Sequence, residues 1–530
     1  MSRYDALIIG AGHNGLVAAA VLARAGLRTL VVEAAAHVGG CSITSELAPG
    51  YRCPTLAHRG ALAPEIIALL ELESQGLSPV RSEVRTCALS GTGRSLAIWV
   101  DHNRTANEIG AFSTADAARY PAFIESVGSI AGVLRDLLSA PTPDMEETSA
   151  RDLISLLRTA RRFRALGSTD AYRLLRWLPM PIADFASEWF ESAPLGALIA
   201  ADGVLGAFLG PRSAGSTAQF LLRATTDAIP IAPGWTARGG PGALTAALAA
   251  AAQKAGAAIR THARVQRILV NGHGAEGVTL DDGEQILAEI VVSSLDPRAT
   301  LLGLIEPAHL PPTFERRARH IRMRGTLAKV NYAVSSAPDF LDLRSRPHDE
   351  RRAVLAGCLR LAPHMDAIER AFDSAKYGRT SQDPFIELTV PSVHDDSLAP
   401  QGQHVLSAYV QFTPYTLRGR TWDDERERLG DLATTAIERY APGFASSVIA
   451  RQVITPLDLE RNHGLTGGQI FQGEIALDQL FVTRPLLGWS RYRTPVSHLF
   501  LCGAGVHPGI GIDGRSGLFA AREILRARAR

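Results

Sequence analysis

Hydrophobic and polar positions at the start of the chain follow the order expected of a strand, a helix and a second strand. Ala6 to Ile9 is a short apolar run of the kind that buried parallel strands contain. The alanine- and leucine-rich segment Leu16 to Ala25 predicts a helix that ends at Gly26, and Leu27 to Val32 predicts the next strand. The pattern therefore predicts a β–α–β unit at the start of an α/β domain.

Three glycines occupy the turn between the first strand and the helix, in the spacing G-x-G-x-x-G. Gly10 allows the tight turn, Gly12 lets the backbone approach a diphosphate, and Gly15 lets the helix pack closely on the sheet. Glu33 follows the second strand, where a carboxylate can hold ribose hydroxyls and disfavours a 2′-phosphate. Strand, helix and acid at this spacing predict a dinucleotide site for FAD or NAD.

The pattern changes several times farther along the chain. Helical patterns such as Asp116 to Leu138 and Ser149 to Phe163 dominate up to about residue 234, and a further helix is expected at Ala243 to Lys254. Strands are then expected at Ala258 to Thr261, Val265 to Val270, Ile286 to Ser293, Ala328 to Val334, Phe385 to Val390 and His404 to Phe412, and a helix at Trp422 to Tyr440. We therefore expect an α/β fold in which a discontinuous nucleotide-binding domain (1–75, 235–298 and 481–530) alternates with a substrate domain (76–234, mainly helical, and 299–480, α+β).

The most apolar part of the chain, Leu174 to Phe208, lies within the helical segment. Its spacing is typical of a helical core, but it also fits the lining of a tunnel for a lipophilic substrate or a face that rests on a bilayer. A basic cluster just upstream is either a solvated helix face or a contact for anionic lipid. This cluster consists of Arg158, Arg161, Arg162 and Arg164.

Composition and charge exclude several classes of protein. A chain of 530 residues is long enough for two or more domains, and a net charge of +2 gives no indication of nucleic-acid binding. The five cysteines are widely spaced and include no C-x-x-C, which argues against a disulfide framework, a zinc site or a dithiol centre. Asp281-Asp282-Gly283 is typical of a hairpin turn, so no metal is expected. No signal peptide or membrane span is visible, and we expect a cytoplasmic protein, with a peripheral membrane contact left open.

Two short stretches near the first unit carry candidate site residues. The glycine pair Gly39-Gly40 would let the backbone pass close to a bound dinucleotide, although a flexible turn has the same composition. His58 and Arg59 precede a helix that starts near Pro64, where they face either a flavin and its substrate or the solvent.

The C-terminal stretch distinguishes FAD from NAD. A buried strand, Leu499 to Cys502, leads through Gly503 and Gly505 into a glycine loop and a helix from Ser516 to Arg526. Gly509, Gly511 and Gly514 repeat the spacing G-x-G-x-x-G, but no strand abuts them and no ribose-binding acid follows, so a second dinucleotide site is rejected. The loop's N–H groups can instead stabilise negative charge on a reduced flavin, which favours FAD.

Several motifs together resemble the FAD-dependent phytoene desaturase superfamily. They are IIGAGHNGL, VVEAAAHVGGCS, PGWTARGGPGALTAAL, PLDLERNHGLTGGQIF, LDQLFVTRP and YRTPVSHLFLCGAGVHPGIGIDG, in this order along nearly the whole chain. Within it the chain is most similar to the phytoene-dehydrogenase-related proteins, which include desaturase-like carotenoid ketolases. The resemblance implies a glutathione-reductase-like Rossmann FAD domain and a substrate domain with a hydrophobic channel.

The resemblance also implies a set of residues that bind FAD non-covalently. They are Gly10, Gly12, Gly15, Glu33, Gly39, Gly40, Val265, Gly503 and Gly505, with Ile512, Asp513 and Gly514 beside the isoalloxazine. The chain departs from the family where Asp513 replaces a small or apolar residue and Ile510 replaces a glycine. An acid there would be a catalytic base, an anchor for a substrate amine, or a group that disfavours the anionic reduced flavin.

These observations predict an FAD-dependent oxidoreductase, a desaturase or dehydrogenase that removes hydride from a lipophilic, polyene- or carotenoid-like small molecule. Oxygen or a quinone would reoxidise the flavin, since no second nucleotide module is visible; a redox-neutral isomerisation would need neither. His58, Asp513 and His507, with Arg59 beside them, are the candidates for proton handling. The alternatives are a flavin amine or hydroxyl oxidase and a non-catalytic flavoprotein that serves as an interaction partner.

Overall fold

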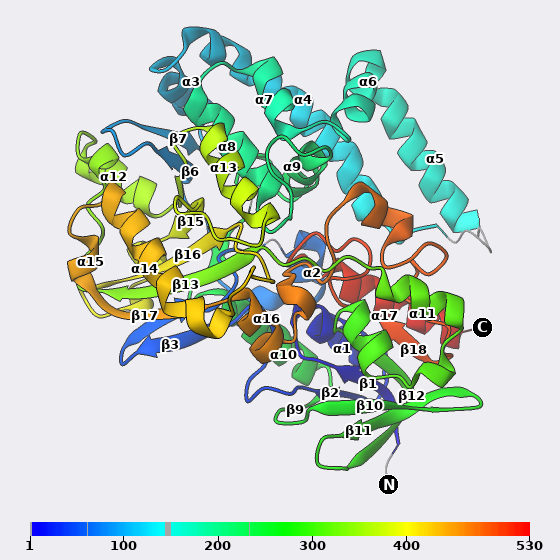
Figure 1. Cartoon of the computed structure of the whole chain (residues 1–530). Helices are drawn as coiled ribbons and strands as arrows, with labels where there is room; N and C mark the ends of the chain where they lie inside the picture. Colours follow the sequence, from blue (N-terminus) through cyan, green and yellow to red (C-terminus); the bar gives the residue numbers. More distant parts are fainter. Residues whose placement is uncertain (1–2, 61, 144–149, 233, 530) are drawn as a thin grey trace.

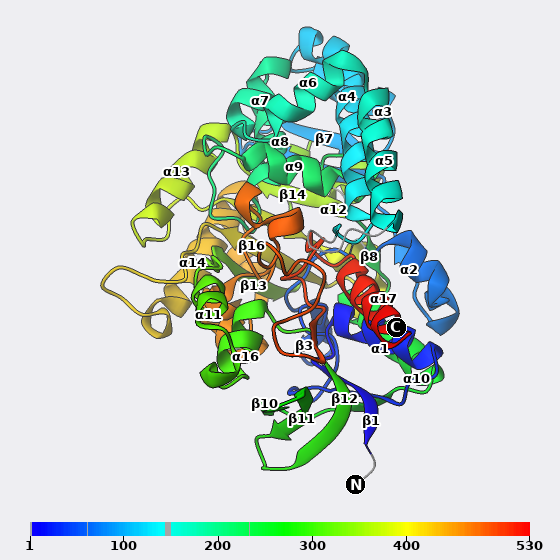
Figure 2. The same ribbon diagram turned by 90° about the vertical axis from the view of Figure 1, so that its right-hand side faces the viewer.

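The computed structural model describes residues 3–529 apart from residue 61, residues 144–149 and residue 233. Two seven-stranded sheets organise these residues, and helices cover both (Figure 1). The N-terminal strand lies in the first sheet, at the bottom of the view, and a group of helices lies at the top, above the second sheet (Figures 1 and 2).

Three separate parts of the chain form the first sheet. Its order is β10–β11–β12–β1–β2–β9, and β18 also pairs with β12. The strands are β1 (Tyr4–Ile9), β2 (Thr29–Val32), β9 (Ala258–Arg260), β10 (Val265–Asn271), β11 (Gly274–Leu280), β12 (Gln285–Ser293) and β18 (Leu499–Leu501). β18, β12, β1, β2 and β9 run parallel, while β10 and β11 form an antiparallel hairpin at the edge. The carboxyl ends of the parallel strands therefore meet along one edge, which is where such sheets bind ligands.

Other elements cover both faces of this sheet, because its strands are apolar on both faces. Ala6 and Ile8 pack toward α1 (His13–Arg24), α10 (Pro241–Lys254) and α17 (Arg515–Arg528), whereas Leu7 and Ile9 face the hairpin and α11 (Pro312–Arg319). α1 begins at His13, three residues before the predicted start at Leu16. Gly12 is its N-cap, so the motif's last glycine, Gly15, lies inside the first turn and touches Gly10.

The second sheet is mixed and has the order β17–β13–β16–β15–β14–β6–β7. Its strands are β6 (Val84–Leu89), β7 (Ser95–Trp99), β13 (Leu327–Val334), β14 (Cys358–Leu361), β15 (Ile386–Thr389), β16 (His404–Gln411) and β17 (Val448–Ile454). β6 and β14 are parallel and the other neighbours antiparallel. α12 (His348–Leu355), α14 (Trp422–Tyr440) and α15 (Phe444–Ser447) pack on one face. Segment 76–234, predicted to be mainly helical, thus supplies two strands to this sheet, because its apolar runs at 84–89 and 95–99 are buried there.

The remaining elements complete the helical layer and two small strand pairs. The layer contains α3 (His102–Gly110), α4 (Thr114–Leu138), α5 (Ala150–Ala165), α6 (Gly167–Trp177), α7 (Ile182–Trp189), α8 (Ala193–Val204) and α9 (Ser216–Ala224). The predicted helix start at Ser149 lies outside the described residues. α13 (Met365–Lys376) packs on the core of this layer, whereas α2 (Pro64–Leu69) and α16 (Pro456–His463) lie elsewhere. β3 (Thr44–Ala48) pairs with β4 (Tyr51–Pro54), as β5 (Pro79–Val80) does with β8 (Thr236–Ala237).

The apolar stretch Leu174 to Phe208 forms the core of this helical layer. Trp177, Phe185 and Leu198 are almost completely buried, and Phe185 packs edge-on against Trp177 with the ring centroids 4.9 Å apart. Among its large apolar side chains, Leu175 is exposed. The burial favours the core interpretation of this stretch over the predicted membrane face.

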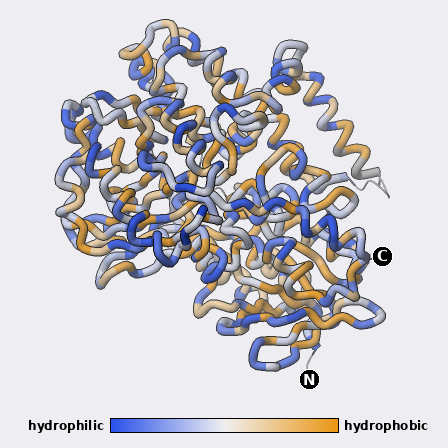
Figure 3. The backbone as a smooth tube through the Cα atoms, in the orientation of Figure 1, coloured by the Kyte–Doolittle hydropathy of each residue, from blue (hydrophilic) through white to orange (hydrophobic). Residues whose placement is uncertain are grey.

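A different helix exposes apolar side chains. Leu153, Ile154, Leu156 and Leu157 of α5 are all exposed, and the basic cluster follows them on the same helix. α5 stands at the edge of the molecule, where apolar and polar positions alternate along it (Figure 3). None of the helices in the described residues is both long and apolar enough to span a bilayer.

Candidate functional site

One continuous cavity of about 630 Å³ connects the two sheets. At one end it is lined by Gly10, Gly12 and Glu33, which follow the carboxyl ends of β1 and β2. At the other end Lys329 and Glu387, from the second sheet, line it. The dinucleotide motif and a polar surface of the second sheet therefore open into the same space.

The glycine turn forms a cradle at the start of α1. A Cβ atom at Gly12 would meet no atom within 4 Å, whereas one at Gly15 would collide with the carbonyl oxygen of Gly10. Gly12 thus faces open space at the N-terminus of α1, where backbone N–H groups and the helix dipole attract a diphosphate. Gly15 closes the turn on the sheet, in the role that the spacing predicted for it.

Glu33 is held in place beside this cradle. Its carboxylate accepts the N–H groups of Ala11, at 2.7 Å, and Ala35, at 2.9 Å, and it lines the cavity. Gly39 donates its N–H to the carbonyl oxygen of Ala11, and Gly40, with a φ of +57°, lines the cavity next to Gly12. Val265, at the start of β10, also lines it. These predicted residues surround one end of the cavity.

A row of polar side chains crosses the second sheet at the other end of the cavity. Register places Arg360 opposite Glu387, Glu387 opposite Tyr409, and Tyr409 opposite Lys329, so the four follow one another across β14, β15, β16 and β13. Since side chains alternate along strands, all four lie on one face. The opposite face carries apolar residues such as Val330 that pack toward α14.

Sequence reasoning missed all four residues of this row, and Lys329 is the one whose environment is most unusual. Its side chain is buried, its Nζ finds no hydrogen-bond partner among the described residues, and it lies 4.2 Å from the ring centroid of Tyr409. Burial lowers the pKa of Lys329 well below its ordinary range. Burial therefore favours the neutral form of the amine, which can accept a proton in the cavity.

His58 lies next to this lysine. Its ring packs on Tyr409 with the centroids 3.7 Å apart, and its Nδ1 lies 2.9 Å from the hydroxyl of Thr389. Its Nε2 is buried without a partner in the described structure. Burial is the main cause that lowers the pKa of His58 well below 6.5, and the nearby positive charge of Arg59 lowers it further. His58 is therefore a neutral imidazole that lines the cavity.

Arg59 also lines the cavity, but its guanidinium is tied to backbone. It donates to the carbonyl oxygens of Ala232, at 2.7 Å, and Arg85, at 2.8 Å. This arrangement fixes a positive charge beside His58 without placing the guanidinium in a catalytic contact.

The C-terminal loop brings Ile512 to the cavity but not the acid that follows it. Ile510, Gly511 and Ile512 line the cavity, whereas Asp513 is buried outside the lining, with Oδ1 accepting the N–H of Arg515 at 3.1 Å. Gly514, with a φ of +76°, caps α17. The Asp513 carboxylate turns to the start of α17, where the backbone N–H of Arg515 donates a hydrogen bond to it, and its catalytic role stays a prediction.

His507 and the neighbouring glycines also lie outside the lining. His507 is buried, its Nε2 lies 3.0 Å from the carbonyl oxygen of Ala140, and burial lowers its pKa to about 4. It thus supports the loop, and its role in proton handling stays a prediction. A Cβ atom at Gly503 or Gly505 would collide with Ser294 or Pro297, so both glycines permit close packing beside Ala504, which lines the cavity.

Replacing Asp513 by asparagine should raise stability in a pH-dependent way. Burial raises the pKa of Asp513 from 3.8 to about 6, so between these values the folded chain holds a proton that the unfolded chain has lost. Wild-type stability therefore falls as the pH rises through this window, and the variant escapes this loss. Thermal unfolding of both proteins should show equal melting temperatures near pH 4 and a higher one for the variant above pH 6. Loss of catalysis in Asp513→Asn would restore the role that the sequence predicted.

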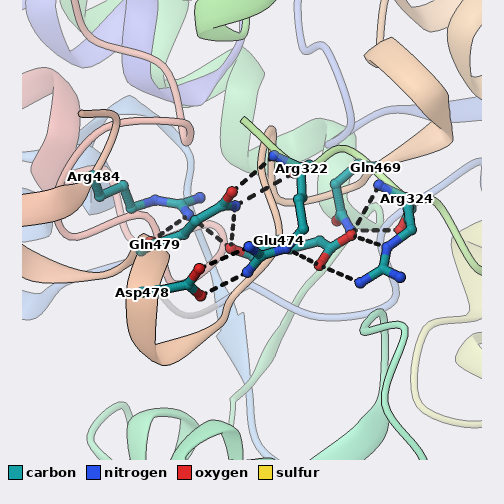
Figure 4. A network of polar contacts seen from close by, with 7 residues as sticks. All are labelled: Arg322, Arg324, Gln469, Glu474, Asp478, Gln479 and Arg484. Carbon is teal, nitrogen blue, oxygen red and sulfur yellow. Dashed lines mark hydrogen bonds and ion pairs between the residues drawn. The ribbon is translucent and has the colours of Figure 1, made fainter. Parts of the chain in front are cut away.

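The buried guanidinium of Arg484 joins two segments that line the cavity, and Figure 4 shows the network around it. Arg484 is nearly inaccessible and donates to the carbonyl oxygens of Phe471, at 2.7 Å, and Ala504, at 2.8 Å, both of which line the cavity. It also donates to the carbonyl oxygens of Gly473, Glu474 and Gln479. In the same network Glu474 binds Arg322 and Arg324. The network joins segment 469–484 to the C-terminal glycine loop.

Arg484→Met should be strongly destabilising. It removes the donor for several buried carbonyl oxygens, each of which costs about 1–3 kcal/mol when left unpaired. Chemical denaturation should show a loss on the order of 3 kcal/mol or more. The matched control is Arg324→Met, because the Arg324 side chain is 54% exposed and its ion pair with Glu474 should contribute about 1 kcal/mol or less. Equal effects of the two substitutions would refute this role for Arg484.

Comparison with known proteins agrees with this geometry. Residues 15–525 match the sequence profile of flavin containing amine oxidoreductases. The chain is 37% identical to pyridine nucleotide-disulfide oxidoreductase domain-containing protein 2 of Rattus norvegicus, over 99% of this chain and 94% of that protein. It is 27% identical to the lycopene-forming phytoene desaturase of Pantoea ananas, over 53% of each chain. The structure of cyclohexylamine oxidase from Brevibacterium oxydans superposes with a TM-score of 0.58 at 18% identity, over 100% of both chains.

These findings decide several of the predictions. The α/β fold with a Rossmann FAD domain and an α+β substrate domain is confirmed, as is FAD as the cofactor. The resemblance to the phytoene desaturase superfamily is supported at a distance, but the finer assignment to the carotenoid ketolase branch is not. The residues fit FAD, because Gly12 leaves an open cradle for the diphosphate and Glu33 presents a fixed carboxylate for the ribose.

Proposed function

Because the chain belongs to the family of flavin containing amine oxidoreductases and is an FAD-dependent oxidoreductase, we propose that it dehydrogenates a small, largely apolar molecule. The observation that carries the proposal is the continuous cavity between the FAD cradle and the polar row of the second sheet. Ile470, Phe471 and Leu205 supply apolar lining near the neutral groups Lys329 and His58. A substrate there would be enclosed between apolar walls and a proton acceptor.

The size of the cavity supports a small substrate rather than a long polyene. Its volume of about 630 Å³ falls in the range typical of a site for one drug-sized ligand. Much of its lining belongs to the cradle around Gly10, Gly12 and Glu33, so FAD takes a large share of the space. We therefore propose a compact lipophilic substrate in place of the carotenoid-like one that the sequence suggested.

The residues of the cavity divide the chemistry between them. FAD, when bound, would supply the acceptor for one hydride, which carries two electrons. The substrate loses that hydride from one carbon and a proton from the neighbouring atom, and the Nζ of Lys329 takes the proton because this amine is neutral and unpaired. His58 packs on Tyr409 beside it and restricts the space in which the substrate lies.

An amine or hydroxyl oxidase is the second candidate. The observation that favours it is the polar character of the row, since Glu387 and Tyr409 line the cavity and can orient an N–H or O–H group. The same balance of hydride and proton applies when the neighbouring atom is nitrogen or oxygen. An isomerase would return the hydride to the substrate, and a non-catalytic flavoprotein would take none.

Anaerobic mixing of the holoenzyme with small terpenes, alcohols and amines tests these assignments. The proposal predicts that a compact lipophilic compound bleaches the flavin and that oxygen or a quinone restores its colour. Hydrogen peroxide formed in air during turnover with an amine or alcohol would favour the oxidase. Turnover without net bleaching would favour the isomerase, and no reduction by any class would contradict the dehydrogenase proposal.

We also propose that this enzyme is cytoplasmic and has a peripheral membrane contact, which involves α5 and not the stretch 174–208. Exposed leucines beside the basic cluster match the composition of helices that lie on anionic bilayers. The protein should float with vesicles that contain phosphatidylserine, and Leu153→Ser combined with Leu157→Ser should abolish this. Tyr377→Ser, at a residue 66% exposed outside α5, is the matched control. Absence of wild-type flotation would contradict the contact.

A further inference from the structure

Arg223, near the end of α9, presents a guanidinium that the protein itself does not fully use. It lines the cavity, and its side chain is 21% exposed. Its ion pair with Asp202 is long, with Nη2 and Oδ1 3.5 Å apart, and its Nε is buried without a hydrogen-bond partner in the described residues. A buried donor of this kind is costly unless a ligand accepts its hydrogen bond.

Asp202 does not depend on Arg223 for its hydrogen bonds. Arg360 binds both oxygens of Asp202, with Nη2 at 2.7 Å from Oδ1 and Nη1 at 3.1 Å from Oδ2. The N–H of Ala232 donates to Oδ2 at 2.8 Å. Asp202 is thus well paired by groups behind the cavity wall, which leaves most of the guanidinium of Arg223 free for an anion.

The charged side chains around the end of the cavity at the second sheet include one more cation than anions. Four guanidinium groups face three carboxylates there: Arg59, Arg85, Arg223 and Arg360 with Asp202, Asp227 and Glu387. Arg85 pairs with Asp227 at 3.2 Å, and Arg360 bridges Asp202 and Glu387. Arg59 has only carbonyl oxygens as acceptors among the described residues. A single anion in the cavity would therefore balance the four guanidinium groups against the carboxylates.

We infer that the substrate carries a carboxylate, which Arg223 binds at the end of the cavity away from the glycine cradle. The inference rests on the proposed function, in which the substrate occupies this cavity. A planar guanidinium suits a carboxylate because two N–H groups can donate to its two oxygens. Leu205 and Phe471 then enclose the apolar body between the carboxylate and the reacting carbon. The substrate class is therefore a compact lipophilic carboxylic acid.

The test titrates the holoenzyme with simple probes and follows the visible flavin spectrum. Benzoate, phenylacetate and 4-phenylbutanoate should give saturable spectral changes, whereas their amides, benzylamine and benzyl alcohol should bind at least about tenfold more weakly. Arg223→Gln should weaken the carboxylates by about tenfold or more, and Arg223→Lys should retain part of the affinity. Thr226→Val, at a neutral residue that lines the same cavity, is the matched control and should leave the affinity unchanged. Phenyl phosphate distinguishes a carboxylate site from a general anion site.

Each outcome decides the inference separately from the proposed function. Equal binding of acids and amides, tighter binding of amines or of phenyl phosphate, or unchanged affinity in Arg223→Gln would overturn it, even if some lipophilic compound reduces the flavin. Carboxylate binding lost with Arg223 would support it, even if no probe reduces the flavin and the dehydrogenase proposal fails. Melting temperature and FAD content establish that the variants are folded, and the comparison of acids with amides on the wild type needs no variant.

Discussion

Replacing Gly12 by alanine is expected to abolish FAD binding while the chain stays folded. The new methyl group meets no protein atom within 4 Å, so the fold tolerates it. It does occupy the open space at the start of α1, where the backbone must approach the diphosphate. Affinity should fall by at least about a hundredfold, which corresponds to about 2.8 kcal/mol. Equilibrium titration of the apoprotein with FAD measures this loss.

Two further glycine variants make this experiment specific. Gly132→Ala, within α4, also meets no atom within 4 Å and should leave FAD binding intact. Gly15→Ala should instead lower the melting temperature of the apoprotein, because its methyl group collides with Gly10. Undiminished FAD binding by Gly12→Ala would mean that the diphosphate lies elsewhere.

Replacing Lys329 by methionine should slow substrate-dependent flavin reduction by about 10²–10⁴-fold, the range expected when a proton acceptor is removed. The same variant should be more stable than the wild type, because it removes a buried amine that has no partner in the described structure. The gain should be largest at low pH and shrink toward pH 10, since the pKa of this lysine is 10.5 in the unfolded chain and burial lowers it well below that value in the folded one. Stopped-flow reduction and thermal unfolding measure the two effects.

Lys329→Arg is the matched control for this assignment. Arginine has a similarly long basic side chain but stays protonated, so it cannot accept a proton. It should therefore be as slow as the methionine variant when its FAD content equals that of the wild type. Wild-type rates in either variant would contradict the role of Lys329 as the proton acceptor.

The FAD end of the site was predictable because its signals are local. Gly10, Gly12, Gly15 and Glu33 lie within one β–α–β unit, and their spacing alone places them around one turn. The bounds of α14 were predicted as observed, since a long amphipathic helix carries its pattern over many residues. Segments 6–9 and 499–501 were recognisable as buried strands because each is a short apolar run.

The substrate end was not predictable because its residues meet only through sheet register. Lys329, Glu387 and Tyr409 each occupy an alternate position in a strand, where a polar residue ordinarily indicates a solvent-facing side. In this fold that side faces an enclosed cavity, which no local pattern can distinguish from solvent. Polar and apolar residues alternate in β13 and β16, but only the pairing of strands distant in the chain shows that the polar face of the sheet borders a cavity.

The orientation of the Asp513 side chain depends on a different feature. Its neighbour Ile512 does line the cavity, so the loop was placed correctly. The direction of the side chain depends on Gly514, whose left-handed backbone starts α17 and offers the N–H of Arg515 to the carboxylate. A residue's distance from the cofactor can thus be anticipated from a motif, while its orientation depends on the turn that follows.

The visible absorption spectrum of the purified protein, before and after denaturation, tests the central claim that this cavity holds FAD without a covalent bond. The account predicts the spectrum of an oxidised flavin, complete release of FAD into solution on denaturation, and one FAD per chain. A protein that stays colourless after incubation with excess FAD would contradict the assignment of the cavity. Flavin that remains attached to the denatured chain would contradict the non-covalent cradle at Gly12 and Glu33.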